Sequence, residues 1–279
     1  MLTFLDLYSV KVIDHLSDSM FRLGYFDDLT MTITAMIRPE ADGTGMQRKL
    51  QEHRGVTLVG GGVLSASDLQ LALELAPRLF AADGGANRSV ALGHMPEQVI
   101  GDLDSLDPEL RARLGERVLH VPDQDSTDLD KCLARIVAPF ILALGFDGAR
   151  LDHTLAAMTS LARHGRARVV MLAAQDIVFL APPGLVLPME VGARVSLYPM
   201  GPVTGRSEGL HWPIAGIGFR PGALIGTSNR ADAARVMLEF DRPGMLVLLE
   251  RDYLSPVLAA LRAAPDWDAH GPGNGPSAS

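Results

Sequence analysis

Aspartates are concentrated in one stretch of this 279-residue chain. Seven of them fall within residues 102–130, against three arginines and no lysine. Two of the seven, Asp102 and Asp104, stand one residue apart after an apolar run that predicts a strand. Carboxylates held side by side repel each other, which raises the pKa of one or calls for a cation between them. Mg²⁺ prefers such ligands together with substrate phosphates. The pair therefore predicts a metal–phosphate site, and a solvated acidic loop is the alternative.

A second acidic segment, residues 123–131, ends on a lysine. Thr127 and Asp130 have the spacing of a helix capping box. Capping accounts for only one or two of the four aspartates in this segment. Lys131 is one of only three lysines in the chain, and lysine binds phosphate as a compact point charge. The segment therefore predicts a helix whose start also carries phosphate-binding and metal-binding groups.

Glycine-rich loops follow two other predicted strands. Residues 60–62 are three glycines, and residues 83–88 read Asp-Gly-Gly-Ala-Asn-Arg before a predicted helix. Glycine lets a ligand approach the backbone, and a helix start presents free N–H groups to an anion. Neither spacing matches a dinucleotide fingerprint or a P-loop. Each loop taken alone is also explained as a tight turn.

Three further segments offer polar or aromatic side chains. Residues 145–153 join a strand to a helix and contain an arginine, an aspartate and a histidine. The aspartate would also suit the helix dipole, and a lone histidine is commonly structural. Trp212 precedes a Thr-Ser-Asn segment at 227–229. A strand tryptophan usually belongs to the core, but it can present a flat surface to an aromatic or cationic ligand.

The elements that must position these groups change in type along the chain. From residue 56 to about 175, short apolar runs alternate with helical periodicity, which predicts a mainly parallel sheet covered by helices. In such sheets ligands bind beyond the carboxyl ends of the strands. The expected strands are 56–59, 79–82, 99–100, 118–121, 140–144 and 168–173. The expected helices are 68–76, 127–137 and 151–164.

Helical periods nearly vanish after residue 175, and strand candidates separated by Gly and Pro predict a β-sandwich or partial barrel. The expected strands are 177–180, 185–187, 194–198, 209–214 and 245–250. We therefore expect an α/β catalytic domain followed by a smaller all-β sandwich domain. The expected parts are a flexible N-terminal extension (1–54), the α/β domain (55–175), the sandwich (176–264) and a disordered Pro/Gly/Ser-rich tail (265–279).

The overall composition narrows the class of protein. A hydrophobic content of 47% with 21% charged residues is sufficient for a core. A net charge of −8 argues against nucleic acid as the main partner. The longest apolar run, residues 136–146, contains a proline and is well short of the ~18 residues of a membrane span. A single cysteine and the lack of a secretory signal pattern predict a cytoplasmic location.

Taken together and in this order, these segments resemble the thiamin pyrophosphokinase (thiamine diphosphokinase) family. The resemblance spans roughly residues 56–262 and rests on DGGANR (83–88), GDLDS (101–105), DQDSTDLDKCL (123–133), RLDH (150–153), SLYP (196–199), GLHW (209–212) and TSN (227–229). It implies the α/β and sandwich architecture and a homodimer with thiamine bound between subunits. It also implies Mg²⁺-dependent transfer of pyrophosphate from ATP to thiamine, giving thiamine diphosphate and AMP.

The resemblance further implies roles for individual residues. Asp102, Asp104 and Asp128 match the family's Mg²⁺-binding aspartates, and Trp212 matches an aromatic that packs on thiamine from the other subunit. The expected catalytic residues are Asp102, Asp104, Asp128, Lys131 and Asp152. The expected nucleotide-binding residues are Gly61, Asp83, Gly84, Gly85, Asn87, Arg88, Arg150, Asp152 and His153. The expected thiamine-binding residues are Gln124, Asp125, Trp212, Ser228 and Asn229.

Two other functions stay open on the sequence alone. A related diphosphokinase acting on another hydroxymethyl heterocycle, such as a pterin, would use the same phosphate groups, and the GLHW and TSN segments argue against it. A nucleotide- or thiamine-binding sensor would keep the fold without turnover. The intact Asp-x-Asp, TDLDK and RLDH segments argue against a sensor. The general base is Asp128 or Asp152, between which the sequence does not choose.

Overall fold

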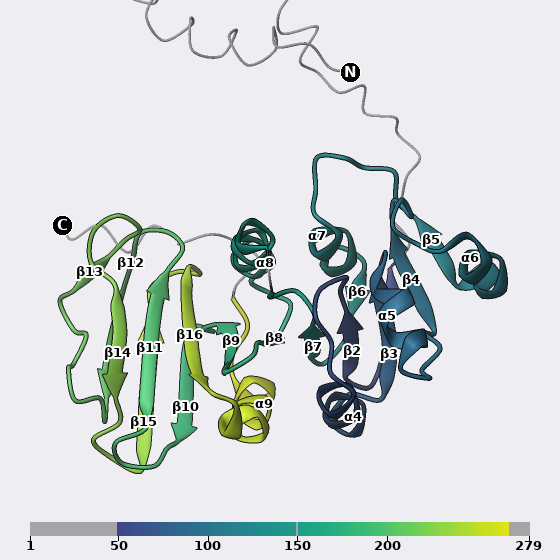
Figure 1. Ribbon diagram of the computed structural model, residues 1–279. Coiled ribbons are helices and arrows are strands. Elements are labelled where there is room, and N and C mark those ends of the chain that lie inside the picture. Colours follow the sequence, from purple (N-terminus) through teal and green to yellow (C-terminus); the bar gives the residue numbers. More distant parts are fainter. Residues whose placement is uncertain (1–48, 149, 268–279) are drawn as a thin grey trace, which may run out of the picture. The chain divides into compact units, whose positions relative to one another are not determined.

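Strands and helices alternate over residues 56–172 of the structure, a computed structural model that describes residues 49–148 and 150–267 (Figure 1). The predicted alternation is therefore confirmed. The strands are β2 (Val56–Val59), β3 (Arg78–Ala82), β4 (Gln98–Gly101), β5 (Val118–His120), β7 (Ile141–Leu144) and β8 (Val169–Leu172). The helices are α4 (Ala66–Leu75), α5 (Gly85–Ala91), α6 (Pro108–Leu114), α7 (Asp128–Leu133) and α8 (Leu151–Arg163).

These strands are parallel wherever they pair with one another. β2, β7 and β8 form one parallel group, and β3, β4 and β5 form a second. The two groups are neighbours, because the Arg78 amide at the start of β3 donates a hydrogen bond to the Gly55 carbonyl oxygen just before β2 (3.3 Å). Parallel strands end at a common edge, so the loops after β3 and β4 lie together.

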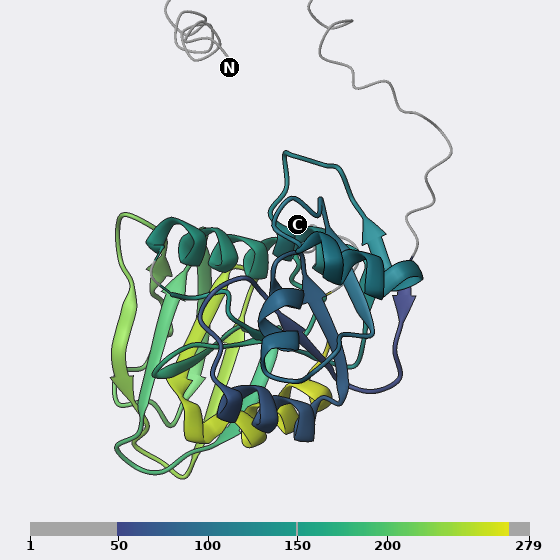
Figure 2. The same cartoon turned by 45° about the vertical axis from the view of Figure 1, so that its right-hand side comes forward.

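Successive residues of the parallel strands enter two different cores. In β7, Ile141 and Ala143 belong to the core that contains residues of α7 and α8, whereas Leu142 and Leu144 belong to the core that contains Ala72 of α4. Side chains alternate across a strand, and a parallel sheet covered on both faces therefore reads as a continuous apolar run. Figure 2 shows α8 on one side of the sheet and α4 on the other.

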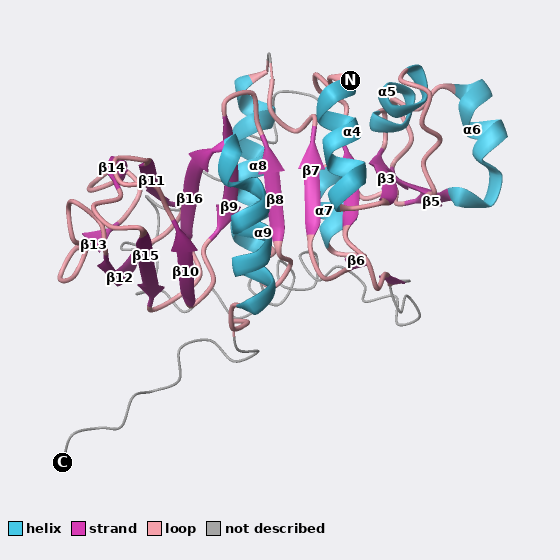
Figure 3. Cartoon of the chain, turned by 90° about the horizontal axis from the view of Figure 1, so that it is seen from below, coloured by secondary structure: helices cyan, strands magenta, loops and turns pink. Residues whose placement is uncertain are grey.

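The strands after residue 175 are antiparallel and form two layers. They are β9 (Asp176–Leu180), β10 (Gly184–Pro188), β11 (Arg194–Pro199), β12 (Val203–Glu208), β13 (Gly218–Phe219), β14 (Gly226–Arg230), β15 (Arg235–Phe240) and β16 (Met245–Glu250). One layer has the order β10-β15-β12-β13. The other belongs to a seven-stranded sheet of order β14-β11-β16-β9-β8-β7-β2. Figure 3 shows this sheet running from the helix-covered strands into the antiparallel ones.

Residues of both layers share one core, to which Leu185 and Leu238 contribute from one layer and Val195 and Val247 from the other. The C-terminal part is therefore an antiparallel sandwich, as the sequence predicts. Because β9 pairs with β8, the sandwich shares a sheet with the α/β part. Residues 227–229 lie in β14 of this shared sheet, and Trp212 lies in the turn that follows β12.

Two predicted elements are wrong in extent or type. The helix expected over 127–137 ends at Leu133, and Ile136–Val137 instead forms β6, parallel to β1 (Leu50–Gln51). Burial of Leu50 with Ile136 explains why tertiary pairing overrides the helical pattern. Residues 209–214 are not a strand. Gly209 has a φ of 77°, and a Cβ there would lie 2.3 Å from the Arg235 carbonyl oxygen, so the chain turns after β12.

Two of the described helices, α6 and α9, were not predicted. α9 (Leu254–Ala263) follows β16 and buries Leu254, Val257, Leu258 and Leu261, which have helical spacing, against the sandwich core. This stretch lies within the region in which only strands were expected. Its spacing is the signal that would have found it.

The two ends of the chain are described only in part. Of the expected extension, residues 49–54 are described and supply β1, and the rest lies outside the described residues. Of the expected tail, residues 265–267 are described, and Trp267 Nε1 donates to the Ala181 carbonyl oxygen (3.1 Å). Within residues 49–148 and 150–267, none of the helices is long and apolar enough to cross a membrane.

Candidate active site

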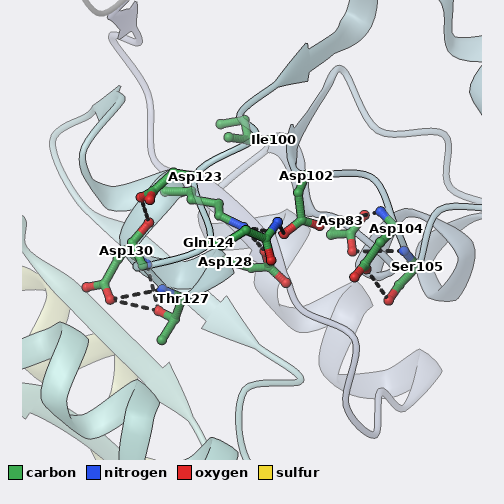
Figure 4. A network of polar contacts seen from close by, with 12 residues as sticks. Asp83, Ile100, Asp102, Asp104, Ser105, Asp123, Gln124, Thr127, Asp128 and Asp130 are labelled. Carbon is green, nitrogen blue, oxygen red and sulfur yellow. Dashed lines mark hydrogen bonds and ion pairs between the residues drawn. The ribbon is translucent and has the colours of Figure 1, made fainter. Parts of the chain in front are cut away.

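Three carboxylates meet at the carboxyl ends of β3 and β4. Asp83 follows β3, and Asp102 and Asp104 follow β4, its parallel neighbour. The Asp83 amide donates to the Ile100 carbonyl oxygen (2.9 Å), which fixes the two loops side by side. One oxygen from each carboxylate lies within 4.8 Å of the other two (Figure 4). Asp83 was expected to bind nucleotide, and the structure places it in the acidic cluster with the two predicted metal ligands.

The loop between the two strand-end aspartates depends on an unusual backbone. Leu103 has a φ of 69° and Asp83 a φ of 43°, a region that residues other than glycine rarely adopt. Leu103 is buried with Leu106 and Leu110, and this burial offsets the backbone strain. The Asp104 amide donates to Asp102 Oδ1 (3.4 Å) across the turn. The apolar side chain between them thus turns inward while both carboxylates point the other way.

Asp83 has the electrostatic character of an incomplete cation site. Its side chain is only 2% exposed, and Oδ2 accepts a hydrogen bond from the Ser105 amide (3.2 Å). Oδ1 is buried and has no hydrogen-bond partner among residues 49–148 and 150–267. Burial raises the pKa of Asp83 to about 6, and the Asp128 and Asp104 carboxylates add to the rise. A buried carboxylate with an unpartnered oxygen, grouped with two more carboxylates, is a donor set that fits Mg²⁺.

Lys131 forms ion pairs with two neighbouring aspartates. Its side chain is 2% exposed, and Nζ donates to Asp102 Oδ2 (2.6 Å) and Asp128 Oδ1 (3.2 Å). Burial would lower the pKa of Lys131, but these carboxylates keep it above its ordinary value. The hydrogen bond from Lys131 in turn lowers the pKa of Asp102. Asp128, a predicted metal ligand, therefore lies beside the cluster and is paired with the ammonium group.

The start of α7 is fixed by the predicted capping box, which is confirmed. Thr127 Oγ1 accepts from the Asp130 amide (3.1 Å), and the Thr127 amide donates to Asp130 Oδ2 (3.3 Å). The buried Asp130 carboxylate also pairs with Arg163 and His164 at the end of α8. Since Asp128 is the first residue of α7 and Lys131 follows three residues later in its last turn, this cap determines where both groups stand.

The glycine loops pack closely against other backbone. A Cβ at Gly62 would lie 2.6 Å from the Gly145 carbonyl oxygen, and one at Gly85 would lie 2.0 Å from that of Val59. Gly61 has open space around it, and its carbonyl oxygen accepts from Arg88 Nε (3.3 Å). These contacts bring the expected nucleotide residues of the first two loops together. They also give Gly62 and Gly85 a packing reason that needs no ligand.

Asn87 connects two of the loops. Its Nδ2 donates to the Ser105 carbonyl oxygen (2.8 Å), and its Oδ1 accepts from the Asp107 amide (3.1 Å). Ser105 in turn donates from its hydroxyl to Asp104 Oδ1 (2.8 Å). Ser105 belongs to the GDLDS segment and had no predicted role of its own. The structure shows that it orients Asp83 and Asp104, and its place directly after Asp104 was the available signal.

The remaining nucleotide candidates stand at the start of α8. Arg150 and Asp152 form an ion pair (2.6 Å), and both side chains are about two-thirds exposed (67% and 65%). His153 is exposed as well. In the part of the chain that the structure describes, no hydrogen bond or ion pair joins these three residues to the acidic cluster.

The expected thiamine residues fall into two groups. Gln124 lies in the cluster, where its Nε2 donates to Asp102 Oδ2 (3.3 Å), and Asp125 is exposed next to it. Trp212 and Asn229 lie in the sandwich. Asn229 is buried, and its amide donates to the Trp212 carbonyl oxygen (2.8 Å) and accepts from the Trp212 amide (3.2 Å).

Ser228, next to Asn229, is exposed with a φ of 62°. Within the described residues, no hydrogen bond or ion pair links the two groups of thiamine residues. Three residues without a predicted role lie around Trp212, namely His211, Arg230 and Asp232. Their position in or beside the GLHW and TSN segments was the only signal for them.

Comparisons with known proteins find one family that this chain resembles in both sequence and fold. Residues 69–171 match the family model described as thiamin pyrophosphokinase, catalytic domain. Thiamine pyrophosphokinase 1 of Oryza sativa subsp. japonica is 30% identical over 195 residues, which cover 57% of this chain and 74% of that protein. Thiamine pyrophosphokinase 1 of Arabidopsis thaliana is 29% identical, with coverage of 57% and 73%. Thiamin pyrophosphokinase from Candida albicans has a similar fold, with a TM-score of 0.59, 16% identity and coverage of 73% and 93%.

Proposed function

The chain belongs to the thiamin pyrophosphokinase family, and we propose that it is itself a thiamine diphosphokinase that transfers the pyrophosphoryl group of ATP to the hydroxyl of thiamine. The products would be thiamine diphosphate and AMP. The observation that carries this proposal is the cluster of Asp83, Asp102 and Asp104, with its unpartnered buried oxygen, beside the buried Lys131. Such a site suits a metal-bound polyphosphate better than an uncharged substrate.

Asp83, Asp102 and Asp104 would hold Mg²⁺, and Asp128 is the further candidate from the family resemblance. When bound, Mg²⁺ would neutralise and orient the phosphates of ATP. Lys131 adds a fixed positive charge, and its ion pairs with Asp102 and Asp128 hold those carboxylates in place. The backbone at Gly84 and Gly85, before and at the start of α5, would supply further donors to a phosphate, whereas the Ala86 and Asn87 amides already donate to the Asp83 and Gly84 carbonyl oxygens.

The chain's own residues would act mainly by positioning. The thiamine oxygen attacks the β-phosphorus in line, the bond from that phosphorus to the oxygen bridging to the α-phosphorus breaks, and AMP leaves. Asp128 is the better placed acceptor for the hydroxyl proton, because it lies beside the cluster and its side chain is 41% exposed. Asp152 is engaged by Arg150 at the start of α8. Holding both substrates in reacting geometry supplies most of the rate.

The thiamine site would be completed by the sandwich. Trp212 is 54% exposed and offers an indole face to an aromatic, cationic ligand. Gln124 next to Asp102 would contact the pyrimidine ring. A homodimer in which Trp212 of one subunit faces the acidic cluster of the other would bring both halves of the site together. We further propose a cytoplasmic enzyme with no nucleic-acid partner.

The test is a direct assay of the purified full-length protein with Mg-ATP and thiamine, in which AMP and thiamine diphosphate are measured by chromatography. We expect both products in equal amounts. Asp102→Ala and Asp128→Ala should lower kcat by orders of magnitude while the unfolding midpoint stays measurable. Asp252→Ala, a change of an exposed aspartate outside the site, is the matched control.

Three results would contradict the proposal in different ways. Thiamine binding without AMP formation would indicate a sensor. AMP formation only with a pterin alcohol would indicate the related diphosphokinase. Full activity of Asp102→Ala at saturating Mg²⁺ would refute the role given to the acidic cluster.

A further inference from the structure

Trp212 is surrounded by charged and aromatic side chains that belong to the sandwich. The guanidinium carbon of Arg230 lies over the indole ring, 5.6 Å from its centroid. The His211 ring meets the indole edge-on, with centroids 4.5 Å apart and planes at 84°. Asp232 Oδ2 lies 2.9 Å from His211 Nδ1, and Asp232 Oδ1 lies 3.8 Å from Arg230 Nε. The exposed indole is therefore already in contact with a cation of its own chain.

Hydrogen bonds hold Trp212 and Arg230 in place although about half of each side chain is exposed. Asn229 is 5% exposed and binds both backbone polar groups of Trp212. The Arg230 amide donates to the same Asn229 oxygen (2.8 Å). The His211 amide donates to the Arg230 carbonyl oxygen (2.9 Å). One buried amide thus fixes Trp212 and Arg230 relative to each other.

A guanidinium over an indole occupies the place that a cationic ring would take. A cation is attracted to the face of an aromatic ring, and one face accommodates one such partner. A cationic ligand on either face would lie within about one Debye length of the guanidinium, so repulsion between the two charges persists. A neutral ring of the same shape is not subject to this repulsion.

We propose that Arg230 is a specificity-determining residue of the acceptor site, which weakens the binding of a positively charged ring at Trp212 relative to a neutral ring of equal shape. The inference rests on the proposed function, which makes thiamine, with its cationic thiazolium, the acceptor. Asp232 and His211 are the other titratable groups that face Arg230, and they hold its charge beside the indole.

The experiment measures two dissociation constants by calorimetry for each protein, in the absence of ATP. One probe is thiamine, and the other is its neutral analogue in which carbon replaces the thiazolium nitrogen. For Arg230→Gln we expect the affinity ratio of thiamine to the analogue to rise about fivefold, or ~1 kcal/mol, because only the cation gains from removal of the charge. Arg230→Lys keeps the charge and should leave the ratio unchanged. Arg242→Gln is the matched control, an ion-paired arginine of similar exposure (48% against 49%).

Steady-state kinetics give a second readout, in which Arg230→Gln should lower KM for thiamine with kcat unchanged. Any effect of the substitution on the order of Trp212 alters both probes equally and cancels in the ratio. An unchanged ratio, or one that also rises in Arg230→Lys, would overturn the inference and leave the proposed function intact. A protein that neither binds thiamine nor releases AMP would refute the proposed function, and the inference with it.

Discussion

Replacing Asp83 with asparagine separates the destabilising effect of its buried charge from its role in Mg²⁺ binding. The side chain is buried, one of its oxygens has no partner, and its backbone has a φ of 43°. Asparagine tolerates that backbone region and keeps an oxygen for the Ser105 amide. Its uncharged amide removes the repulsion between Asp83 and the Asp102 and Asp104 carboxylates, each of which has an oxygen within 4.8 Å. We therefore expect Asp83→Asn to stabilise the metal-free protein.

The magnitude follows from the pKa of Asp83, which burial raises from 3.8 to about 6. The unfolded chain loses this proton near pH 4 and the folded protein near pH 6. Stability is therefore lost as pH rises through this window, by 1.36 kcal/mol per pKa unit and about 3 kcal/mol in all. Because asparagine does not titrate, the Asp83→Asn protein keeps the unfolding free energy that the unsubstituted protein loses in this pH window. The gain should be about 2–3 kcal/mol at pH 8 and roughly half of that at pH 5.

The assay is urea unfolding of both proteins at pH 5 and pH 8, with and without Mg²⁺. Mg²⁺ should raise the unfolding free energy of the unsubstituted protein, by ~2.7 kcal/mol at one hundred times its dissociation constant, and should do so much less in Asp83→Asn. Asp252→Asn, at an exposed position, controls for the change of charge. A loss of stability at pH 8, or a gain of equal size at both pH values, would refute the electrostatic reasoning.

Three further predictions concern the groups around the cluster. Lys131→Met leaves Asp102 and Asp128 without their buried cation and should cost about 3 kcal/mol in urea unfolding at pH 7 in addition to most of kcat; an unchanged midpoint would contradict the pairing. Asn87→Ala removes the hydrogen bonds to the backbone at residues 105–107 and should weaken Mg²⁺ binding about tenfold (~1.4 kcal/mol), with KM for thiamine unchanged. Titration with the metal alone measures this effect. If Asn87 contacts the nucleotide directly, the substitution would instead change the binding of ATP in the absence of metal. Trp212→Ala should raise KM for thiamine about tenfold, while the melting temperature stays within a few degrees because the indole is half exposed. A collapse of the melting temperature would instead place Trp212 in the core.

The elements were predictable where local pattern and tertiary packing agree. β7 and β8 are buried on both faces, so their apolar runs signal strands directly. Thr127 and Asp130 satisfy a rule that depends on three residues of spacing, and the capping box forms as expected. The pattern failed at residues 134–137, where pairing with β1 is a contact to a segment more than eighty residues away. It failed again at Gly209, whose positive φ is set by the approach of the backbone at Arg235.

The sequence predicted the kind of chemistry at the candidate site, but it did not predict which aspartates lie together there. The two aspartates of the Asp-x-Asp segment are linked by one intervening residue, so their proximity follows from the chain itself. Asp83 joins them only because β3 and β4 are adjacent in the sheet. Asp128 stays a predicted metal ligand, and in the structure it pairs with Lys131, as Asp102 does, since the cap at Thr127 fixes the start of α7.

By itself, the sequence determined the residue types: hard oxygen ligands, one lysine among arginines, glycines at strand ends, and an aromatic residue near small polar groups. These depend on local chemistry, which spacing along the chain preserves. Only the tertiary structure decided which carboxylate is buried and unpartnered, that Asn229 holds the Trp212 backbone, and that Arg230 covers the indole. Each of these depends on burial and on contacts between separate strands, and those arise only when the sheets assemble.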